Sequence, residues 1–244
     1  MNLGAGFAAP AGDKIDSRPV LIVTGLVQEA RIAAGPGMIV ICSSSDPQQL
    51  RALLATLDPS SFRGVISFGV AGGLDPSLKS GDVVVATEVL SGDTRFLAGL
   101  ALNEEMIASA ALKRRRVVRG GLAGVEQVIA ATACKAALHS ETGAAAVDME
   151  SHIAAAYASA AGIPFAALRV ISDPASRSLP ALAKSAIKPN GDIDLRKVLR
   201  GLVRNPTTLR ALVSTGIDFN RALRSLRGCR GFLIGGDDLA TVDI

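Results

Sequence analysis

Three acidic residues stand out because they lie in otherwise apolar stretches: Asp148 and Glu150 in AAAVDMESHIAAAY, and Asp173 in FAALRVISDPAS. Each stretch begins like a buried strand, and the acids come where that strand ends. In open α/β sheets, ligands bind outside the carboxyl ends of the strands. Carboxyl groups placed there can transfer protons or stabilise positive charge that develops on a substrate. We therefore predict that the three acids converge on one ligand site.

Structural roles would also explain some of these residues. Asp173 precedes Pro174 and fits an ordinary turn or helix cap. Glu150 fits the first turn of a helix, where the helix dipole favours an acid. Arg169 is harder to explain in this way, because an unpaired charge in a buried strand is costly. We expect Arg169 to support the site by pairing with an acid of the same cluster.

Glycines mark a second segment, FGVAGGLDPSLKSGDVVVATEV at 68–89, between two β-branched runs. Glycine lets a backbone turn tightly and approach a ligand closely. Ala71, Gly72 and Gly73 therefore predict a tight turn, which is either a ligand loop or a plain connection.

The elements that must position these residues follow from alternating patterns. Short β-branched runs alternate with Ala/Leu-rich stretches, which is typical of βα units on a largely buried sheet. We predict an α/β fold: a single domain with a central mixed β-sheet flanked by helices, and a helical C-terminal segment. The predicted strands are 19–26, 37–42, 64–70, 82–90, 116–124, 144–149 and 165–172, and the predicted helices are 46–57, 103–112, 134–139 and 150–161.

Composition limits the function classes. The 244 residues fit one domain, and 49% hydrophobic against 20% charged residues can build a sizeable core. Aromatic residues make up 3% and the net charge is +4, which argues against nucleic-acid binding. The three cysteines are far apart and form no CxxC, which indicates a reduced cytosolic protein without a zinc site. With no GxGxxG and no metal cluster in the sequence, we expect neither an organic cofactor nor a metal.

The chain divides into a loose leader at 1–17, a domain at 18–235 and a tail at 236–244. The leader lacks the pattern of a signal peptide, and no run of eighteen apolar residues predicts a membrane span. The segment 195–230 is basic, with nine Lys/Arg and one acid between Arg196 and Arg230. Its pattern predicts amphipathic helices whose basic face is solvated, or else meets an anionic membrane surface or a lipid-linked ligand.

Taken together, the glycine segment and AAVDMESHIAAAYASAAGIPFAALRVISD resemble the purine nucleoside phosphorylase and methylthioadenosine/adenosylhomocysteine nucleosidase superfamily over roughly residues 18–175. The ordered set of these motifs is more specific than any one of them. The Arg-rich end, the GLVQEARIA segment and the short length are most similar to the hopanoid-associated phosphorylases, which are thought to release adenine from adenosylhopane.

The resemblance implies roles for the acids. Glu150 matches the carboxylate that binds both ribose hydroxyls, and Asp173 matches the group that donates to purine N7, for which burial must raise its pKa. Adenine would leave through a transition state with oxocarbenium character. The other implied substrate-binding residues are Met149 against the sugar, Asp148 as a polar neighbour, Ser172 orienting the acid, Gly72 in the glycine segment, and Val128 and Ile129 at the base.

The attacking group is open between two alternatives. In the nucleosidases, an acid after the first strand activates water. Our alignment of VTGLVQEARIAAG places Ala30 there, followed by the cation Arg31, whereas a slip of one residue brings Glu29 into the acid's place. We expect phosphorolysis with inorganic phosphate as co-substrate, and hydrolysis of methylthioadenosine or adenosylhomocysteine is the alternative. The implied phosphate-binding residues are Arg31, Ser43, Ser44, Gly69 and Arg95, although the serines also fit a helix N-terminus.

The expected partners follow from the same resemblance. They are a small-molecule nucleoside, lipid-linked in the hopanoid reading, and further copies of the chain in a homo-oligomer; no nucleic acid is expected. A hopanoid substrate predicts a wide apolar mouth beyond the ribose 5′ position. The expected location is the cytoplasm, with peripheral contact to the inner membrane surface.

Overall fold

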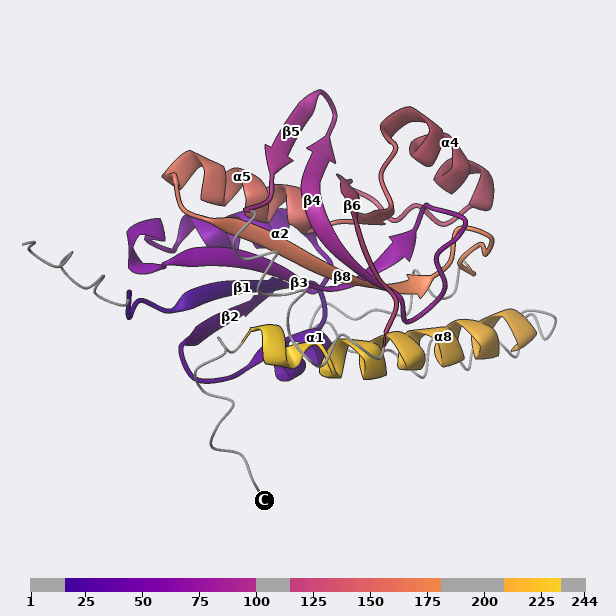
Figure 1. Cartoon of the computed structure of the whole chain (residues 1–244), viewed down its shortest axis with the longest axis horizontal. Helices are drawn as coiled ribbons and strands as arrows, with labels where there is room; N and C mark the ends of the chain where they lie inside the picture. Colours follow the sequence, from indigo (N-terminus) through magenta and orange to yellow (C-terminus); the bar gives the residue numbers. More distant parts are fainter. Residues whose placement is uncertain (1–15, 100–114, 181–208, 234–244) are drawn as a thin grey trace, which may run out of the picture.

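A computed structural model of the chain describes residues 16–99, 115–180 and 209–233 (Figure 1). Its strands are β1 (Val20–Thr24), β2 (Met38–Cys42), β3 (Gly64–Gly73), β4 (Val83–Ser91), β5 (Thr94–Leu97), β6 (Val117–Gly124), β7 (Ala146–Asp148) and β8 (Phe165–Asp173). Its helices are α1 (Val27–Ala33), α2 (Pro47–Ala55), α4 (Thr132–Thr142), α5 (Ser151–Ala161) and α8 (Leu209–Arg227), with 3-10 turns η1 (Pro59–Ser61) and η4 (Arg230–Phe232).

The strands form one mixed sheet. β1 pairs in parallel with β2 and β3, and β3 pairs in parallel with β8. β8 pairs antiparallel with β4, β4 and β7 both pair in parallel with β6, and β7 returns antiparallel to the end of β3. The strands β3, β8, β4, β6 and β7 therefore pair in a closed circuit. This arrangement confirms the predicted α/β class with a central mixed sheet flanked by helices.

Alternation along the strands separates two apolar cores. In β1, Leu21 packs in a cluster with Leu50 of α2 and Ile153 of α5. Its neighbour Ile22 packs in the other cluster, with Leu226 of α8. Successive strand side chains point to opposite faces, so one strand supplies both layers. Helices α2 and α5 accordingly cover one face of the sheet, and α1 and α8 cover the other (Figure 1).

The structure differs from the sequence-based elements in three places. The prediction of a tight turn at Ala71–Gly73 is wrong. Strand β3 continues through these residues, because Gly72 pairs with Val147 of β7 and with Asp173 of β8. Helix α1 and strand β5 were not predicted. The basic segment contributes one long helix, α8, to the described part of the chain. The predicted leader (except 16–17), helix 103–112 and tail lie outside the described residues.

Helix α8 is attached to the sheet by apolar packing and two side-chain hydrogen bonds. Leu226 is fully buried in the core cluster on that face. Ser80 Oγ donates to the Asp218 carbonyl at 2.7 Å, and Ser225 Oγ donates to the Gly81 carbonyl at 2.7 Å. Within the described ranges, no helix has the length and apolar character needed to cross a membrane.

The docking of α8 gives a stability test. Leu226→Ala leaves a cavity between α8 and the sheet, so we expect it to lower the free energy of unfolding by about 2–5 kcal/mol. Ile217→Ala on the same helix is the matched control, because Ile217 is 52% exposed; we expect a change within about 0.5 kcal/mol. Urea unfolding followed by circular dichroism measures both. Equal destabilisation by the two variants would show that α8 is not packed as described.

Candidate active site

A cavity of about 380 Å³ opens where β3, β7 and β8 end. This volume lies in the range of small-molecule sites. Glu29, Asp148, Glu150 and Asp173 all line it. The predicted convergence of three acids is therefore present, and Glu29 adds a fourth. The remaining predicted substrate-binding residues that line the cavity are Gly72, Val128, Ile129, Met149 and Ser172.

Arg169 of β8 organises the inner end of the cavity. Its side chain is fully buried and pairs with Asp148 and with Glu150, whose Oε2 lies 3.5 Å from Arg169 Nη2. The same Nη2 donates to Ser67 Oγ at 2.6 Å and to Ser151 Oγ at 3.2 Å. Ser151 Oγ also donates to Asp148 Oδ2 at 2.5 Å, which fixes the start of α5 and the position of its cap residue Glu150. The expectation that Arg169 pairs within the acid cluster is confirmed.

Two glycines leave the space that this cluster needs. A Cβ on Gly69 would lie 2.5 Å from Arg169 Nη1 and 2.7 Å from Glu29 Oε1. A Cβ on Gly25 would lie 2.6 Å from Glu150 Oε1. All three distances are shorter than any ordinary carbon contact, so a side chain at either position would displace the charged groups. Gly69 thus provides room for the Arg169 guanidinium and the Glu29 carboxyl group.

Glu29 is held by backbone donors from two elements. Its Oε2 accepts from the N–H groups of Gly25 and Leu26, both at 2.9 Å, and its Oε1 accepts from the Val70 N–H at 2.7 Å. Burial raises the pKa of Glu29, while the nearby Arg169 charge and the three backbone donors oppose that rise. Ala30, the alternative residue in the alignment, does not line the cavity. The carboxyl group facing the cavity from α1 is therefore that of Glu29.

Glu150 shares the same buried environment. Its pKa is raised to about 8: burial is the largest cause, Arg169 opposes the rise, and the neighbouring Asp148 and Glu29 add to it. Several acids here face a single guanidinium, so the cluster retains a proton more readily than an isolated carboxyl group does. A carboxyl group that can gain or lose a proton near neutral pH suits the binding of hydroxyl groups and of developing positive charge.

Asp173 lines the same cavity and pairs with a different buried cation. Its Oδ2 is 2.5 Å from Nζ of Lys135, a fully buried residue of α4, and its Oδ1 accepts from Ser172 Oγ at 2.7 Å. Burial raises the pKa of Asp173, whereas the Lys135 charge and the hydrogen bonds of Lys135 and Ser172 lower it. The Ser172 contact is the orienting contact that we expected from the sequence.

One face of α8 also lines the cavity. It consists of Leu212, Thr215, Gly216 and Phe219, and the apolar Leu179 and Val125 line the cavity as well. On α8 these positions are spaced by three and four residues, so they form one face of the helix. The described lining is therefore polar where the strands end and mainly apolar toward α8.

The residues expected to bind phosphate are dispersed. Arg31 is exposed on α1, and Arg95 pairs with Glu88 at 3.0 Å on the hairpin of β4 and β5. Neither residue lines the cavity, and neither do Gly69 and Ser44. Ser43 is fully buried, and its Oγ has no hydrogen-bond partner among the described residues. Of this serine loop, only Ser45 lines the cavity.

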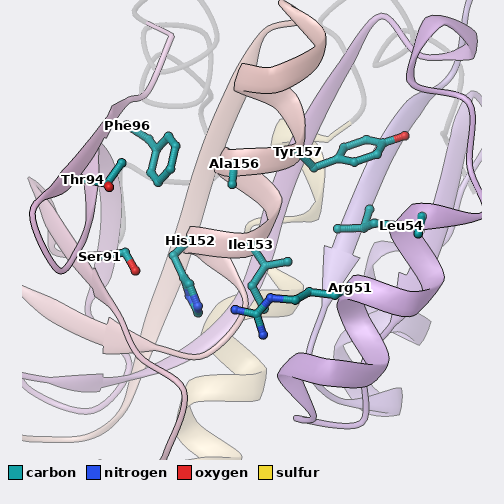
Figure 2. Close-up of a pocket in the computed structure, with 10 residues that line it drawn as sticks. Arg51, Leu54, Ser91, Thr94, Phe96, His152, Ile153, Ala156 and Tyr157 are labelled. Atoms are coloured by element: carbon teal, nitrogen blue, oxygen red, sulfur yellow. The ribbon is translucent and has the colours of Figure 1, made fainter.

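A second hollow, of about 370 Å³, lies over α2, α5 and β5 (Figure 2). Phe96, Ile153 and Tyr157 give it an apolar character. Its charged groups are already paired: Arg51 binds Glu126 at 2.5 Å, and His152 Nε2 lies 2.9 Å from the same carboxylate. No carboxyl group of the described residues lines this hollow, so we assign the chemistry to the first cavity. The Glu126 pairs instead anchor the segment whose neighbours Val125, Val128 and Ile129 line that first cavity.

Sequence reasoning missed Lys135 and the α8 lining. Lys135 is the one charged residue in the apolar run TACKAALHS, and such an isolated charge was the available signal. The α8 residues gave no signal, because nothing in a basic amphipathic pattern indicates which face meets a cavity.

Family membership follows from the sequence match. The family model described as the phosphorylase superfamily matches residues 14–203, most of the chain. The chain belongs to the phosphorylase superfamily. Among curated proteins, no sequence matches it.

Solved structures share the fold of this superfamily member. The 5′-methylthioadenosine/S-adenosylhomocysteine nucleosidase of Neisseria meningitidis has a TM-score of 0.65 at 18% identity, covering 89% of this chain and 98% of its own. The Helicobacter pylori nucleosidase of the same description has a TM-score of 0.63 at 19% identity, covering 88% of this chain and 96% of its own. Helicobacter pylori futalosine hydrolase has a TM-score of 0.63 at 18% identity, covering 89% of this chain and 96% of its own. At these identities the likeness shows a common fold.

The raised pKa of Glu150 predicts how the stability of this superfamily member depends on pH. Between about pH 5 and pH 8 the folded chain keeps a proton that Glu150 releases on unfolding, since its ordinary pKa is 4.5 and its folded value is about 8. Stability therefore falls as pH rises through this window. We expect Glu150→Gln to flatten the decline, measured as the melting temperature from pH 5 to 8. The exposed Glu141→Gln is the control and should keep the wild-type slope; an unchanged slope in Glu150→Gln would contradict the assignment.

Proposed function

We propose that the protein cleaves the N-glycosidic bond of a purine nucleoside that carries a large apolar group at its 5′ position. The observation that carries this proposal is the pair of buried acids, Glu150 and Asp173, which line one cavity and each pair with a different buried cation. A nucleoside has two polar ends for them: ribose hydroxyl groups, which donate to a carboxylate, and a purine nitrogen, which accepts a proton. Membership of the phosphorylase superfamily supports the same reaction class.

The proposed reaction separates charge across the cavity. The C1′–N9 bond breaks with its electron pair going to the purine, and the proton of Asp173 passes to N7. Positive charge develops on the ribose, where Glu150 holds the 2′ and 3′ hydroxyls and stabilises that charge. Positioning and fixed electrostatics thus supply most of the catalysis.

Water is the acceptor that the described lining favours. Glu29 faces the cavity close to Glu150 and has a raised pKa, so it is placed to take a proton from an attacking water. The water oxygen then bonds to C1′ while its proton goes to Glu29. A phosphate dianion would instead approach several carboxyl groups, and the described cations Arg169 and Lys135 are already paired with acids. This reverses our expectation from the sequence, which was phosphorolysis.

Phosphorolysis is the second candidate, and one observation favours it. The serine loop after β2 has a buried Ser43 hydroxyl without a partner in the described part of the chain, and Ser44 and Ser45 have φ values of 53° and 57°. Such strained polar loops can form anion sites. In that reaction inorganic phosphate, as co-substrate, bonds to C1′ in place of water and gives a ribose 1-phosphate.

The apolar outer part of the cavity supports a lipid-like 5′ substituent. Leu179, Leu212 and Phe219 offer no group that would bind a charged or amino-acid-like substituent. A polycyclic hydrocarbon attached at the 5′ carbon, as in adenosylhopane, matches the polarity of these side chains. We therefore propose adenosylhopane as the substrate, in agreement with the resemblance to the hopanoid-associated phosphorylases.

A lipid-linked substrate also gives a role to the outer face of α8. Val213 and Ile217 are 51% and 52% exposed, and Arg221 and Arg224 follow on the same face at helical spacing. Apolar and basic side chains on one face fit an anionic bilayer. We propose peripheral contact of this face with the inner membrane surface, which would bring the α8 side of the cavity close to the lipid.

The reaction and its acceptor are tested by adenine release from 5′-alkylthioadenosines and adenosylhopane, with and without inorganic phosphate. We expect release without phosphate, and a decrease in kcat of about 10²–10⁴-fold in Glu29→Gln, Glu150→Gln and Asp173→Asn. The control Glu141→Gln removes an exposed carboxylate and should match wild type. Release that requires phosphate and survives Glu29→Gln would establish phosphorolysis, and no release under either condition would refute the proposed function.

Membrane contact is tested by sedimentation with vesicles of phosphatidylglycerol and phosphatidylcholine. We expect binding at low salt that weakens as salt is added, and loss of binding in Arg224→Glu with Arg227→Glu. Arg18→Glu with Arg63→Glu makes the same change in net charge on exposed residues elsewhere and should keep most of the binding. Equal loss in both double variants would contradict a specific role for the α8 face.

A further inference from the structure

Lys135 has an environment that packing alone does not explain. Its side chain is fully buried, and its Nζ lies 2.5 Å from Asp173 Oδ2 and 3.3 Å from the Asp173 carbonyl. The carbonyls of Pro174 and Arg177 lie 3.1 Å from the same nitrogen. All four partners are hydrogen-bond acceptors, and a lysine ammonium is the group that brings three donors. A buried cation of this kind is rare unless it is paired.

The lysine joins the two walls that would enclose the purine. It projects from α4, which follows the cavity residues Val128 and Ile129, and it binds the chain directly after β8. Two backbone contacts reinforce the same junction: Leu179 N–H donates to the Ala130 carbonyl at 2.9 Å, and Thr132 N–H donates to Ser178 Oγ at 3.2 Å. Lys135 is the charged member of this junction, and its charge faces the reacting acid.

We propose that Lys135 is a positioning residue, which holds the Asp173 carboxyl group toward the leaving purine and provides the countercharge once that acid has given up its proton. This inference rests on the proposed function. In the step itself, the C1′–N9 electron pair goes to the purine, the Asp173 proton goes to N7, and a carboxylate remains beside the ammonium of Lys135. Lys135 contacts the Asp173 carboxyl group but is not among the residues that line the cavity, so it acts on the substrate through Asp173.

The charges around Asp173 make this role measurable. Lys135 faces it from α4, and Asp218 faces it from α8 with the opposite sign. Asp218 is itself paired with Arg177 and Arg221. Burial raises the pKa of Asp173 and Lys135 opposes that rise, so removal of the lysine charge must raise the pKa further. Because Asp173 donates in its protonated form, activity falls as pH rises through its pKa. Loss of Lys135 therefore moves the basic limb of the profile to higher pH.

The experiment compares wild type, Lys135→Met, Lys135→Arg and Lys79→Met as full-length chains. The pH profile of kcat/KM for adenine release from a 5′-alkylthioadenosine is measured first. We expect Lys135→Met to lose about 10²-fold in kcat and its basic limb to move up by roughly 1–3 pH units. Lys135→Arg keeps the charge and should keep the limb near its wild-type position. Lys79 is exposed on the surface, so Lys79→Met should leave both the rate and the limb unchanged.

A second substrate separates positioning of the acid from general damage. The 4-nitrophenyl riboside of the same 5′-substituted sugar has a leaving group that departs without a proton, so it does not need Asp173. We expect Lys135→Met to retain most of the wild-type rate on it. An unshifted basic limb, or equal losses on both substrates, would overturn the role of Lys135. Failure of the wild-type protein to release adenine would instead refute the proposed function.

Discussion

The site depends on one buried guanidinium. Arg169 lies in the middle of β8, between β3 and β4, and neutralises acids that come from α1, β7 and the start of α5. Removing it would leave Asp148, Glu150 and Glu29 buried without a counterion. Uncompensated buried charge of this kind strongly lowers the free energy of unfolding. Gly25 and Gly69 follow from the same constraint, because any side chain there would occupy the space of the charged groups. The ion-pair cluster thus fixes both the local backbone and the shape of the inner cavity.

Charge is distributed unequally over the two walls. Around Arg169, burial and the neighbouring carboxyl groups that share this one cation raise the pKa of Glu150 to about 8. On the other wall, Asp173 forms an ion pair with Lys135, and Asp218 adds a smaller effect of negative charge. In the proposed reaction, positive charge develops on the ribose beside the acid-rich wall, and a carboxylate is left on the wall that already holds a cation. Each wall is therefore preset for the charge that the reaction would create on it.

The sequence predicted the framework better than the details of the site. Strands such as 165–172 and the helix after Glu150 follow from periodicity and composition, which are local properties. The prediction of a turn at Ala71–Gly73 was wrong because pairing with β7 and β8 keeps these residues in a strand. Local sequence does not predict such long-range pairing. The sequence left open whether Ala30 or Glu29 takes the position after the first strand, and of the two the fold places Glu29 on the cavity lining. The contact of Lys135 with Asp173 and the place of α8 at the cavity join segments far apart in the chain, which local sequence patterns do not reveal.

Chemistry and selectivity are assigned to different parts of the fold. Arg169, Ser172 and Asp173 belong to one strand, β8, which pairs with β3 and β4 at Arg169 and with β3 at Asp173, so backbone pairing sets the spacing of the two charged residues. The apolar lining comes from α8, which is joined to the sheet by a few packed residues and two side-chain hydrogen bonds. Substitutions on the inner face of α8 would alter how the 5′ substituent binds while leaving the acids in place. In the proposed function, one face of α8 lines the cavity and the opposite face contacts the membrane. The same helix would therefore bind the 5′ substituent and lie at the membrane that supplies the lipid-linked substrate.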